Sequence, residues 1–238
     1  MKWGGTVMAE TVMVVEDDED IMEILTAYLR KHGYSVITAV NGLDALRLCE
    51  QGGMDLLLTD IVLPDMEGTK LTARIREQSD LPIIMMSCKK EAADIVGGLE
   101  LGADDYITKP FEPSVVIARI KSVLRRRKRY EAPAASETLL WKDDRLEIDH
   151  AACQVRVNGQ AIHLFAKELQ LLLLFASHPE QVFHVDQLYE QVWGWDKHSD
   201  IRTVMVHIRN LRKKIEENPA APRYIETVRG FGYKFKAR

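Results

Sequence analysis

The chain has 238 residues, of which 46% are hydrophobic and 29% are charged, and its net charge is −4. This length suits two domains of roughly 120 residues each, and the composition is that of a globular protein, which excludes a disordered chain. No apolar run approaches the roughly 20 residues that a bilayer crossing needs, so we expect no membrane contact. Residues 1–9 lack the apolar core of a signal peptide and are interpreted as an N-terminal extension.

Charge divides unevenly along the chain. Residues 1–138 hold 17 basic and 23 acidic side chains, whereas residues 139–238 hold 15 basic and 13 acidic ones. An acidic first half and a basic second half indicate two different tasks. The three cysteines, Cys49, Cys88 and Cys153, are odd in number and far apart. They favour free thiols in a reducing cytoplasm over a disulfide or zinc framework.

The first half alternates short apolar runs with amphipathic stretches. Five such βα units predict a parallel sheet covered by helices on both faces, a flavodoxin-like doubly wound α/β fold. The predicted strands are Thr11–Val15, Ser35–Ala39, Leu56–Thr59, Ile83–Ser87 and Tyr106–Thr108, and the predicted helices are Asp20–Lys31, Gly42–Glu50, Thr69–Glu77, Ala92–Leu101 and Pro113–Lys128.

A basic run followed by Pro and Ala, "RRRKRYEAPAASE", then breaks the pattern, so we expect a first domain over 10–128 and a linker over 129–138. The second domain, 139–238, begins with short strands around an Asn-Gly turn and ends in a Gly-rich hairpin. Three helices lie between, which is the layout of an α+β winged helix-turn-helix. The predicted elements are strands Arg145–Asp149, Gln154–Val157 and Ala161–Leu164, helices Ala166–Ser177, Val185–Trp193 and Ile201–Glu217, and the hairpin within "YIETVRGFGYKFK".

Carboxylates follow two of the apolar strands. Glu16 and Asp17 come directly after "VMVV", and Asp60 comes after "LLLT". In the strand order 2-1-3-4-5 the first and third strands are neighbours, and ligands bind outside their carboxyl ends. Three carboxylates this close repel one another unless a cation neutralises them, and Mg²⁺ or Mn²⁺ suits such oxygen ligands.

One of these carboxylates could also attack a phosphoryl group, because aspartyl phosphates are established intermediates. Ser87 and Lys109 end two further strands and would add a hydroxyl and an ammonium to the same crevice. Other acidic groups have simpler interpretations. Residues 18–20 suit an acidic helix start, Asp55 a solvated loop, and Asp65 a turn beside the site.

Four segments, "VVEDD", "LLLTDIVLPDMEG", "PIIMMS" and "GADDYITKPF", resemble in order and spacing a response-regulator receiver domain, and the whole chain resembles the OmpR/PhoB family. The resemblance implies that Asp60 accepts a phosphoryl group from a sensor histidine kinase. Its implied site comprises metal ligands, a switch pair and a phosphate-binding lysine. The ligands of Mg²⁺ (or Mn²⁺) are Glu16, Asp17, Asp60 and the Val62 carbonyl. The switch pair is Ser87 with Tyr106, and the phosphate-binding lysine is Lys109.

The chain is therefore expected not to be an enzyme beyond phosphoryl transfer to itself. Val62 and Lys89 stand where family members vary the lifetime of the phosphoryl group. Because an apolar Val62 cannot orient a hydrolytic water, we expect slow self-dephosphorylation.

Family resemblance also implies dimerisation on phosphorylation through the fourth helix, fifth strand and fifth helix. Exposed ion pairs on that face would fix the relative orientation of the two subunits more than they would add to the free energy of association. Ile95 and Val115 stand where the family commonly has a charged pair, so this part of the contact is expected to rest on buried apolar surface and not on charge. The residues assigned to this face are Ile95, Glu100, Asp104, Asp105, Val115, Arg119, Lys121 and Arg126.

In the third helix of the second domain, Val204, Ile208, Leu211 and Ile215 form one apolar stripe that faces a core. The rest resembles the family pattern "RTVxVHIRxLRKK…TVRGxGY", which implies that this helix enters the major groove of promoter DNA and the wing an adjacent minor groove. Phosphate contacts and base-edge contacts follow from this resemblance. The former are assigned to Trp193, Arg202, Thr203, His207, Arg212, Thr227, Arg229 and Tyr233, and the latter to Arg209, Asn210 and Lys213.

Two positions of the second domain depart from the family pattern. Asn210 stands where relatives often carry Arg, so their preferred bases do not transfer. Phe165 stands where a Thr helix cap is usual. Loss of this cap would lower the stability by about 1 kcal/mol without affecting function.

Two alternatives remain open from the residues. A phosphatase of the haloacid-dehalogenase type places a second Asp two residues after its nucleophile, and here that position is Val62. The second domain could instead bind protein or RNA. The favoured interpretation is a transcriptional regulator with a sensor histidine kinase, direct-repeat DNA, RNA polymerase and a second copy of itself as partners.

Overall fold

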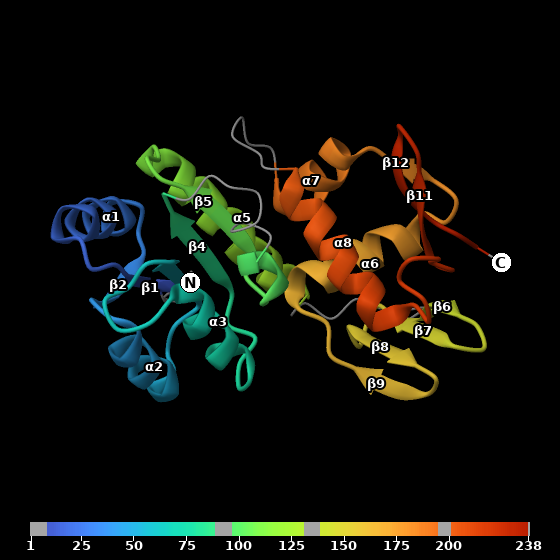
Figure 1. Ribbon diagram of the computed structural model, residues 1–238, viewed down its shortest axis with the longest axis horizontal. Helices are drawn as coiled ribbons and strands as arrows, with labels where there is room; N and C mark the ends of the chain where they lie inside the picture. Colours follow the sequence, from blue (N-terminus) through green and yellow to red (C-terminus); the bar gives the residue numbers. More distant parts are fainter. Residues whose placement is uncertain (1–8, 89–96, 131–138, 195–200, 238) are drawn as a thin grey trace, which may run out of the picture.

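The computed structural model describes residues 9–88, 97–130, 139–194 and 201–237, without the side chains of 125–130 and 139. It has two lobes side by side, an N-terminal one built on a five-stranded sheet and a C-terminal one built on helices and two small sheets (Figure 1). No helix in these ranges is long and apolar enough to cross a membrane.

The N-terminal lobe is the predicted doubly wound fold. Its strands are all parallel in the order β2-β1-β3-β4-β5, which confirms the expected switch point between β1 and β3. The elements are β1 (Thr11–Val15), α1 (Glu19–Lys31), β2 (Ser35–Ala39), α2 (Gly42–Gln51), β3 (Leu56–Asp60), α3 (Gly68–Arg76), β4 (Ile83–Ser87), β5 (Asp105–Thr108) and α5 (Pro113–Tyr130). Residues 97–100 are also helical, and the rest of the predicted helix Ala92–Leu101 lies largely outside the described residues.

Burial explains why these strands are almost wholly apolar. One cluster packs the sheet against α1 and α5, and another packs its opposite face against α2 and α3. All five residues of β3 and all five of β4 are buried, as expected for strands covered on both faces. The carboxyl ends of the strands are thus held rigidly.

The interpretation of Asp55 as a solvated loop residue is wrong. Its carboxylate is half-buried and accepts a hydrogen bond of 2.9 Å from the backbone N–H of Thr11. Asp65 accepts hydrogen bonds of 2.8 Å from the N–H groups of Gly42 and Leu43, so it ties the loop after β3 to the start of α2. Asp18 caps α1 by accepting from the N–H of Ile21, which confirms the acidic helix start.

The C-terminal lobe has the predicted helix order with two strands that the sequence analysis missed, β6 and β10. Asn158 and Gly159 both have positive φ, 52° and 77°, as the predicted two-residue hairpin turn requires. The elements are β6 (Leu139–Lys142), β7 (Leu146–Asp149), β8 (Gln154–Val157), β9 (Gln160–Ile162), α6 (Ala166–Ser177), β10 (Val182–Phe183), α7 (Val185–Trp193), α8 (Arg202–Ile215), β11 (Ile225–Val228) and β12 (Gly232–Phe235). The predicted apolar stripe of α8 is confirmed, because Val204, Ile208, Leu211 and Ile215 are all buried.

Candidate functional site

The acidic cluster lies where the sequence places it, at the carboxyl ends of β1 and β3. Glu16 and Asp60 are 1% and 7% exposed, and Asp17 is exposed. One carboxylate oxygen from each of the three lies within 4.8 Å of the others. Because β1 and β3 pair in register from Val12 to Val15, the fold itself brings these groups together.

Lys109 bridges two of these carboxylates. Its Nζ lies 2.7 Å from Glu16 Oε2 and 2.5 Å from Asp60 Oδ2, while the N–H of Val62 donates to Asp60 Oδ1 over 3.0 Å. Burial tends to lower the pKa of Lys109, but its hydrogen bonds with Asp60 and Glu16 raise the pKa overall. Burial raises the pKa of Glu16, against the lowering effect of Lys109.

The charge balance of this cluster fits a metal ion. One ammonium offsets one of three carboxylates, which leaves the charge that a divalent cation would neutralise. The three side chains offer carboxylate oxygens, which hard cations prefer. The cluster of Glu16, Asp17 and Asp60 is thus consistent with a metal site.

Gly68 keeps the loop beside Asp60 close to the strand end. Its N–H donates to the carbonyl of Ile61 over 2.7 Å, and a Cβ at this position would lie 2.1 Å from the Asp60 carbonyl oxygen. Only glycine fits so near the backbone. The "DMEG" segment therefore holds the loop after β3 against the site.

Two further predicted site residues are buried. Ser87 is fully buried at the end of β4, and its carbonyl accepts from the N–H of Lys109 over 2.7 Å. Tyr106 is 2% exposed, and its ring belongs to an apolar cluster that includes Met85, Leu99 and, from α8 of the other lobe, Val206. Periodicity within either domain does not predict that a residue of the second domain joins this cluster.

The residues assigned to the dimer face mostly bond within the chain. Asp105 pairs with Arg119 at 2.8 Å, and Asp104 pairs with Arg76 at 2.9 Å. The expectation that these ion pairs are exposed is wrong, since Asp104, Asp105 and Arg119 are at most 5% exposed. Lys121 is exposed and Val115 is half-buried, whereas Ile95, Lys89 and the Arg126 side chain lie outside the described residues.

The residues assigned to DNA fall into two groups. Those on or beside the wing remain near the surface. Arg229 is exposed, and Arg212 of α8 donates to the Ile225 carbonyl and to Thr227 Oγ1 and lies over the Tyr233 ring. Phe231 at the wing tip is 68% exposed, a residue that the sequence analysis left out. Arg202 is half-buried.

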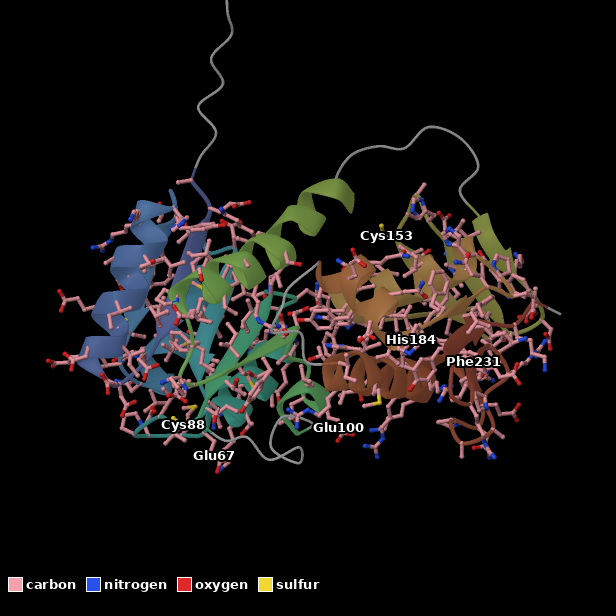
Figure 2. All side chains as sticks on the ribbon, turned by 90° about the horizontal axis from the view of Figure 1, so that it is seen from above. Glu67, Cys88, Glu100, Cys153, His184 and Phe231 are labelled. Atoms are coloured by element: carbon pink, nitrogen blue, oxygen red, sulfur yellow. The ribbon has the colours of Figure 1, made fainter. Side chains whose placement is uncertain are left out.

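The second group faces the N-terminal lobe. Trp193 donates its Nε1–H to the Asp104 carbonyl over 2.9 Å, and Asn210 donates to the Leu99 carbonyl over 3.3 Å. Arg209 pairs with Glu100, and Lys213 Nζ lies 3.8 Å from the same carboxylate. Glu100 lies at the junction of the two lobes in Figure 2. Thr203 and His207 are buried as well.

A receiver fold with an acidic strand-end cluster, joined to a winged helix, defines a DNA-binding response regulator of a two-component system. Sequence models of the response regulator receiver domain and of the transcriptional regulatory protein C terminal match residues 12–121 and 159–235. The chain belongs to the OmpR/PhoB family of such transcriptional regulators.

Relatives match over nearly the whole chain. The uncharacterized transcriptional regulatory protein YcbL of Bacillus subtilis is 41% identical over 93% of this chain and 98% of its own. The DNA-binding response regulator MtrA of Mycolicibacterium paratuberculosis is 42% identical over 95% and 98%. The solved structure of DrrB, a Thermotoga maritima OmpR/PhoB homolog, superposes with a TM-score of 0.52 at 31% identity, over 97% of this chain and 100% of its own.

Proposed function

We propose that this protein is a phosphorylation-dependent regulator that accepts a phosphoryl group on Asp60 and then binds promoter DNA as a dimer. The observation that carries the proposal is the buried Asp60 carboxylate, held at a strand end beside Glu16, Asp17 and Lys109. Members of the family are not classed as enzymes, and the chemistry proposed here is directed at the protein itself.

Phosphoryl transfer starts from the side chain of Asp60. An oxygen of its carboxylate forms a bond to phosphorus while the bond from phosphorus to the imidazole nitrogen of a kinase phosphohistidine breaks. The departing nitrogen takes up a proton from solvent. Lys109, which now donates to Asp60 Oδ2, then donates to a phosphoryl oxygen, and the Ser87 hydroxyl lies on the neighbouring strand end to do the same.

Glu16, Asp17, Asp60 and the carbonyl of Val62 would hold Mg²⁺ (or Mn²⁺). When bound, this cation supplies positive charge that offsets the negative charge developing on the transferred group. Val62 is 60% exposed beside Asp60, and its isopropyl side chain offers no polar atom to position a water molecule. Self-dephosphorylation is slow for this reason.

The C-terminal lobe binds DNA. The major groove receives α8, and the wing of β11 and β12 follows an adjacent minor groove, with base edges met by Arg209, Asn210 and Lys213. A receiver dimer presents two winged helices to a direct repeat in the cytoplasm, where RNA polymerase is the further partner. A sensor histidine kinase supplies the phosphoryl group.

Intact-mass spectrometry of the full chain tests the first step. Treatment with acetyl phosphate and Mg²⁺ is expected to add one phosphoryl group to the wild type and none to Asp60→Asn, and chelation of Mg²⁺ should stop the reaction. Equal labelling of the two proteins, or labelling that ignores chelation, contradicts the proposed site.

A further inference from the structure

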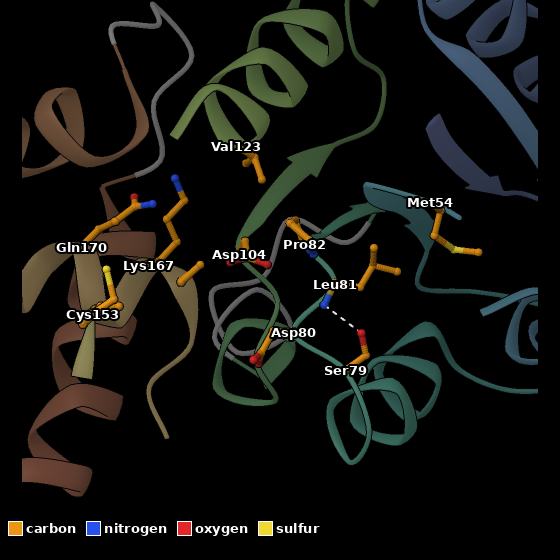
Figure 3. A pocket seen from close by; sticks show the side chains of 12 residues that line it. Met54, Ser79, Asp80, Leu81, Pro82, Asp104, Val123, Cys153, Lys167 and Gln170 are labelled. Atoms are coloured by element: carbon orange, nitrogen blue, oxygen red, sulfur yellow. Dashed lines mark hydrogen bonds between the residues drawn. The ribbon is translucent and has the colours of Figure 1, made fainter. Parts of the chain in front are cut away.

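A cavity of about 410 Å³ lies between the two lobes, and none of its lining residues belongs to the strand-end site of Asp60. One side is formed by α6 and the other by the segment that precedes β4 (Figure 3). Its volume suits a small organic molecule, since ligand sites in proteins commonly measure roughly 300–1,000 Å³. The apolar part of the lining includes Met54, Leu81, Pro82, Val123, Ala166 and Leu169.

Gln170 places an unpaired polar atom on the α6 side of this cavity. The residue is 8% exposed, and its Oε1 has no hydrogen-bond partner among the residues that the structure describes. A buried acceptor without a partner is costly, because burial removes it from solvent and nothing is gained in return. Gln170 interrupts the apolar run "LQLLLLF" of α6, where a leucine would be buried without this cost. The amide oxygen therefore points to a partner that carries an N–H or O–H group.

Ala166 leaves room for such a partner. Ala166, Leu169 and Gln170 lie on one face of α6, since the second and third of them follow the first by three and four residues. A larger side chain at position 166 would fill the space next to Gln170. Cys153, which precedes β8, lines the same cavity with a half-buried thiol.

The opposite wall is held in place by hydrogen bonds of its own. Arg76 donates to the Leu81 carbonyl over 2.5 Å and to the Ser79 carbonyl over 3.3 Å. The N–H of Leu81 donates in turn to Ser79 Oγ over 3.1 Å (Figure 3), and Pro82 follows with its fixed φ. A wall that is already ordered loses little conformational entropy when a ligand binds, which favours affinity.

The charged groups around the cavity already have partners. Asp104 pairs with Arg76 at 2.9 Å, and Lys167 donates to a backbone carbonyl of α7 over 2.9 Å. At the rim, Asp80 Oδ1 lies 2.8 Å from His163 Nε2. A charged ligand would lose its hydration here without gaining a counter-ion, whereas a neutral one has only to satisfy the amide oxygen on α6.

We propose that this cavity binds a small neutral molecule with an apolar body and one N–H or O–H donor, such as an indole or a phenol. The apolar body lies against Leu81 and Leu169, and the donor bonds to Gln170 Oε1. Such a molecule contacts both lobes, so its binding stabilises their arrangement relative to each other. The chain then has a second chemical input in addition to the phosphoryl group on Asp60. This inference goes beyond the proposed function and does not depend on it.

Alkylation of Cys153 tests the site in the full unphosphorylated chain, with indole as the ligand. Iodoacetamide is applied at mildly alkaline pH, because burial raises the pKa of the Cys153 thiol, and labelling is read by peptide mass spectrometry. Cys88 is exposed and gives the internal control. 1-Methylindole keeps the ring and lacks the donor, and Gln170→Leu removes the acceptor. Gln160→Leu repeats that substitution at an exposed position of β9 and is the matched control.

Indole should slow the alkylation of Cys153 and leave that of Cys88 unchanged. In the wild type and in Gln160→Leu, 1-methylindole should need about a tenfold higher concentration for the same protection, because it leaves Gln170 Oε1 unpaired. In Gln170→Leu the two ligands should act alike.

Absence of Cys153 protection at millimolar indole overturns the proposal. Equal potency of the two ligands in the wild type overturns it as well, since water alone then satisfies Gln170. The labelling needs neither phosphate nor DNA, so its failure is distinct from a failure of the proposed function.

Discussion

The arrangement in which α8 packs against the N-terminal lobe is here called the closed form, and His207 should make it sensitive to pH. Its ring is 1% exposed between Trp193 and the N-terminal lobe, and neither ring nitrogen has a hydrogen-bond partner among the residues that the structure describes. Burial, followed by the positive charge of Lys167 on α6, lowers the pKa of His207 from 6.5 to about 3. The positive charges of Lys214 on α8 and Arg76 on α3 also lower the pKa of His207, whereas the backbone of Asp104 raises it.

The size of the effect follows from proton linkage. The closed form keeps His207 neutral, whereas the open form lets it take up a proton below pH 6.5, so acid favours opening. Through His207 alone, lowering the pH from 7 to 5.5 should raise the ratio of open to closed chains about eightfold, roughly 1.2 kcal/mol. Burial also raises the pKa of Asp104, whose protonation favours the closed form and opposes His207.

Small-angle X-ray scattering of the unphosphorylated chain across this pH range measures the extended fraction. The wild type should become more extended at pH 5.5, and His207→Gln should lose that response. His178→Gln, at an exposed histidine of α6's end, should keep it. An identical pH response in the wild type and His207→Gln would refute the assignment of the linkage to His207.

The remaining predictions concern the receiver. Gly68→Ala should lower the free energy of unfolding by about 1–3 kcal/mol in a urea titration, because its Cβ meets the Asp60 carbonyl; an unchanged midpoint contradicts this. Glu16→Gln should raise the Mg²⁺ concentration needed for half-maximal phosphorylation at least tenfold, because it removes a buried anion. An unchanged Mg²⁺ requirement would exclude Glu16 as a ligand. Isolated phosphoprotein should keep its phosphate well beyond seconds, and a half-life of seconds refutes the role given to Val62. Dimerisation of the phosphorylated protein should depend little on salt concentration, because Ile95 and Val115 are expected to bury apolar surface between the subunits. A steep loss of dimer at high salt refutes that view.

The strand-end site was predictable because each part of it has a local signal. An apolar strand buried on both faces ends where its first polar residue appears, and the parallel order then fixes which ends are neighbours. Glu16, Asp17, Asp60, Ser87 and Lys109 all lie where this reasoning places them. Strand β10 was missed because two residues carry no periodicity, and β6 because its sequence "LLWK" does not alternate apolar and polar residues.

The packing of the two lobes was not predictable from periodicity, because it depends on the complementarity of distant surfaces. One signal was nevertheless present. Val206 is apolar on the face of α8 that should be polar, and Asn210 and Lys213 follow it at helical spacing on the same face. Asp55 was misjudged for a similar reason, since its partner, the N–H of Thr11, is 44 residues away.

Phosphate on Asp60 should convert this protein into one that binds promoter DNA. The most direct test is genomic DNA occupancy by full-length wild type and Asp60→Asn, each with and without acetyl phosphate. Acetyl phosphate should raise occupancy at discrete sites for the wild type only. Equal occupancy of both proteins, with or without the phosphodonor, would contradict it.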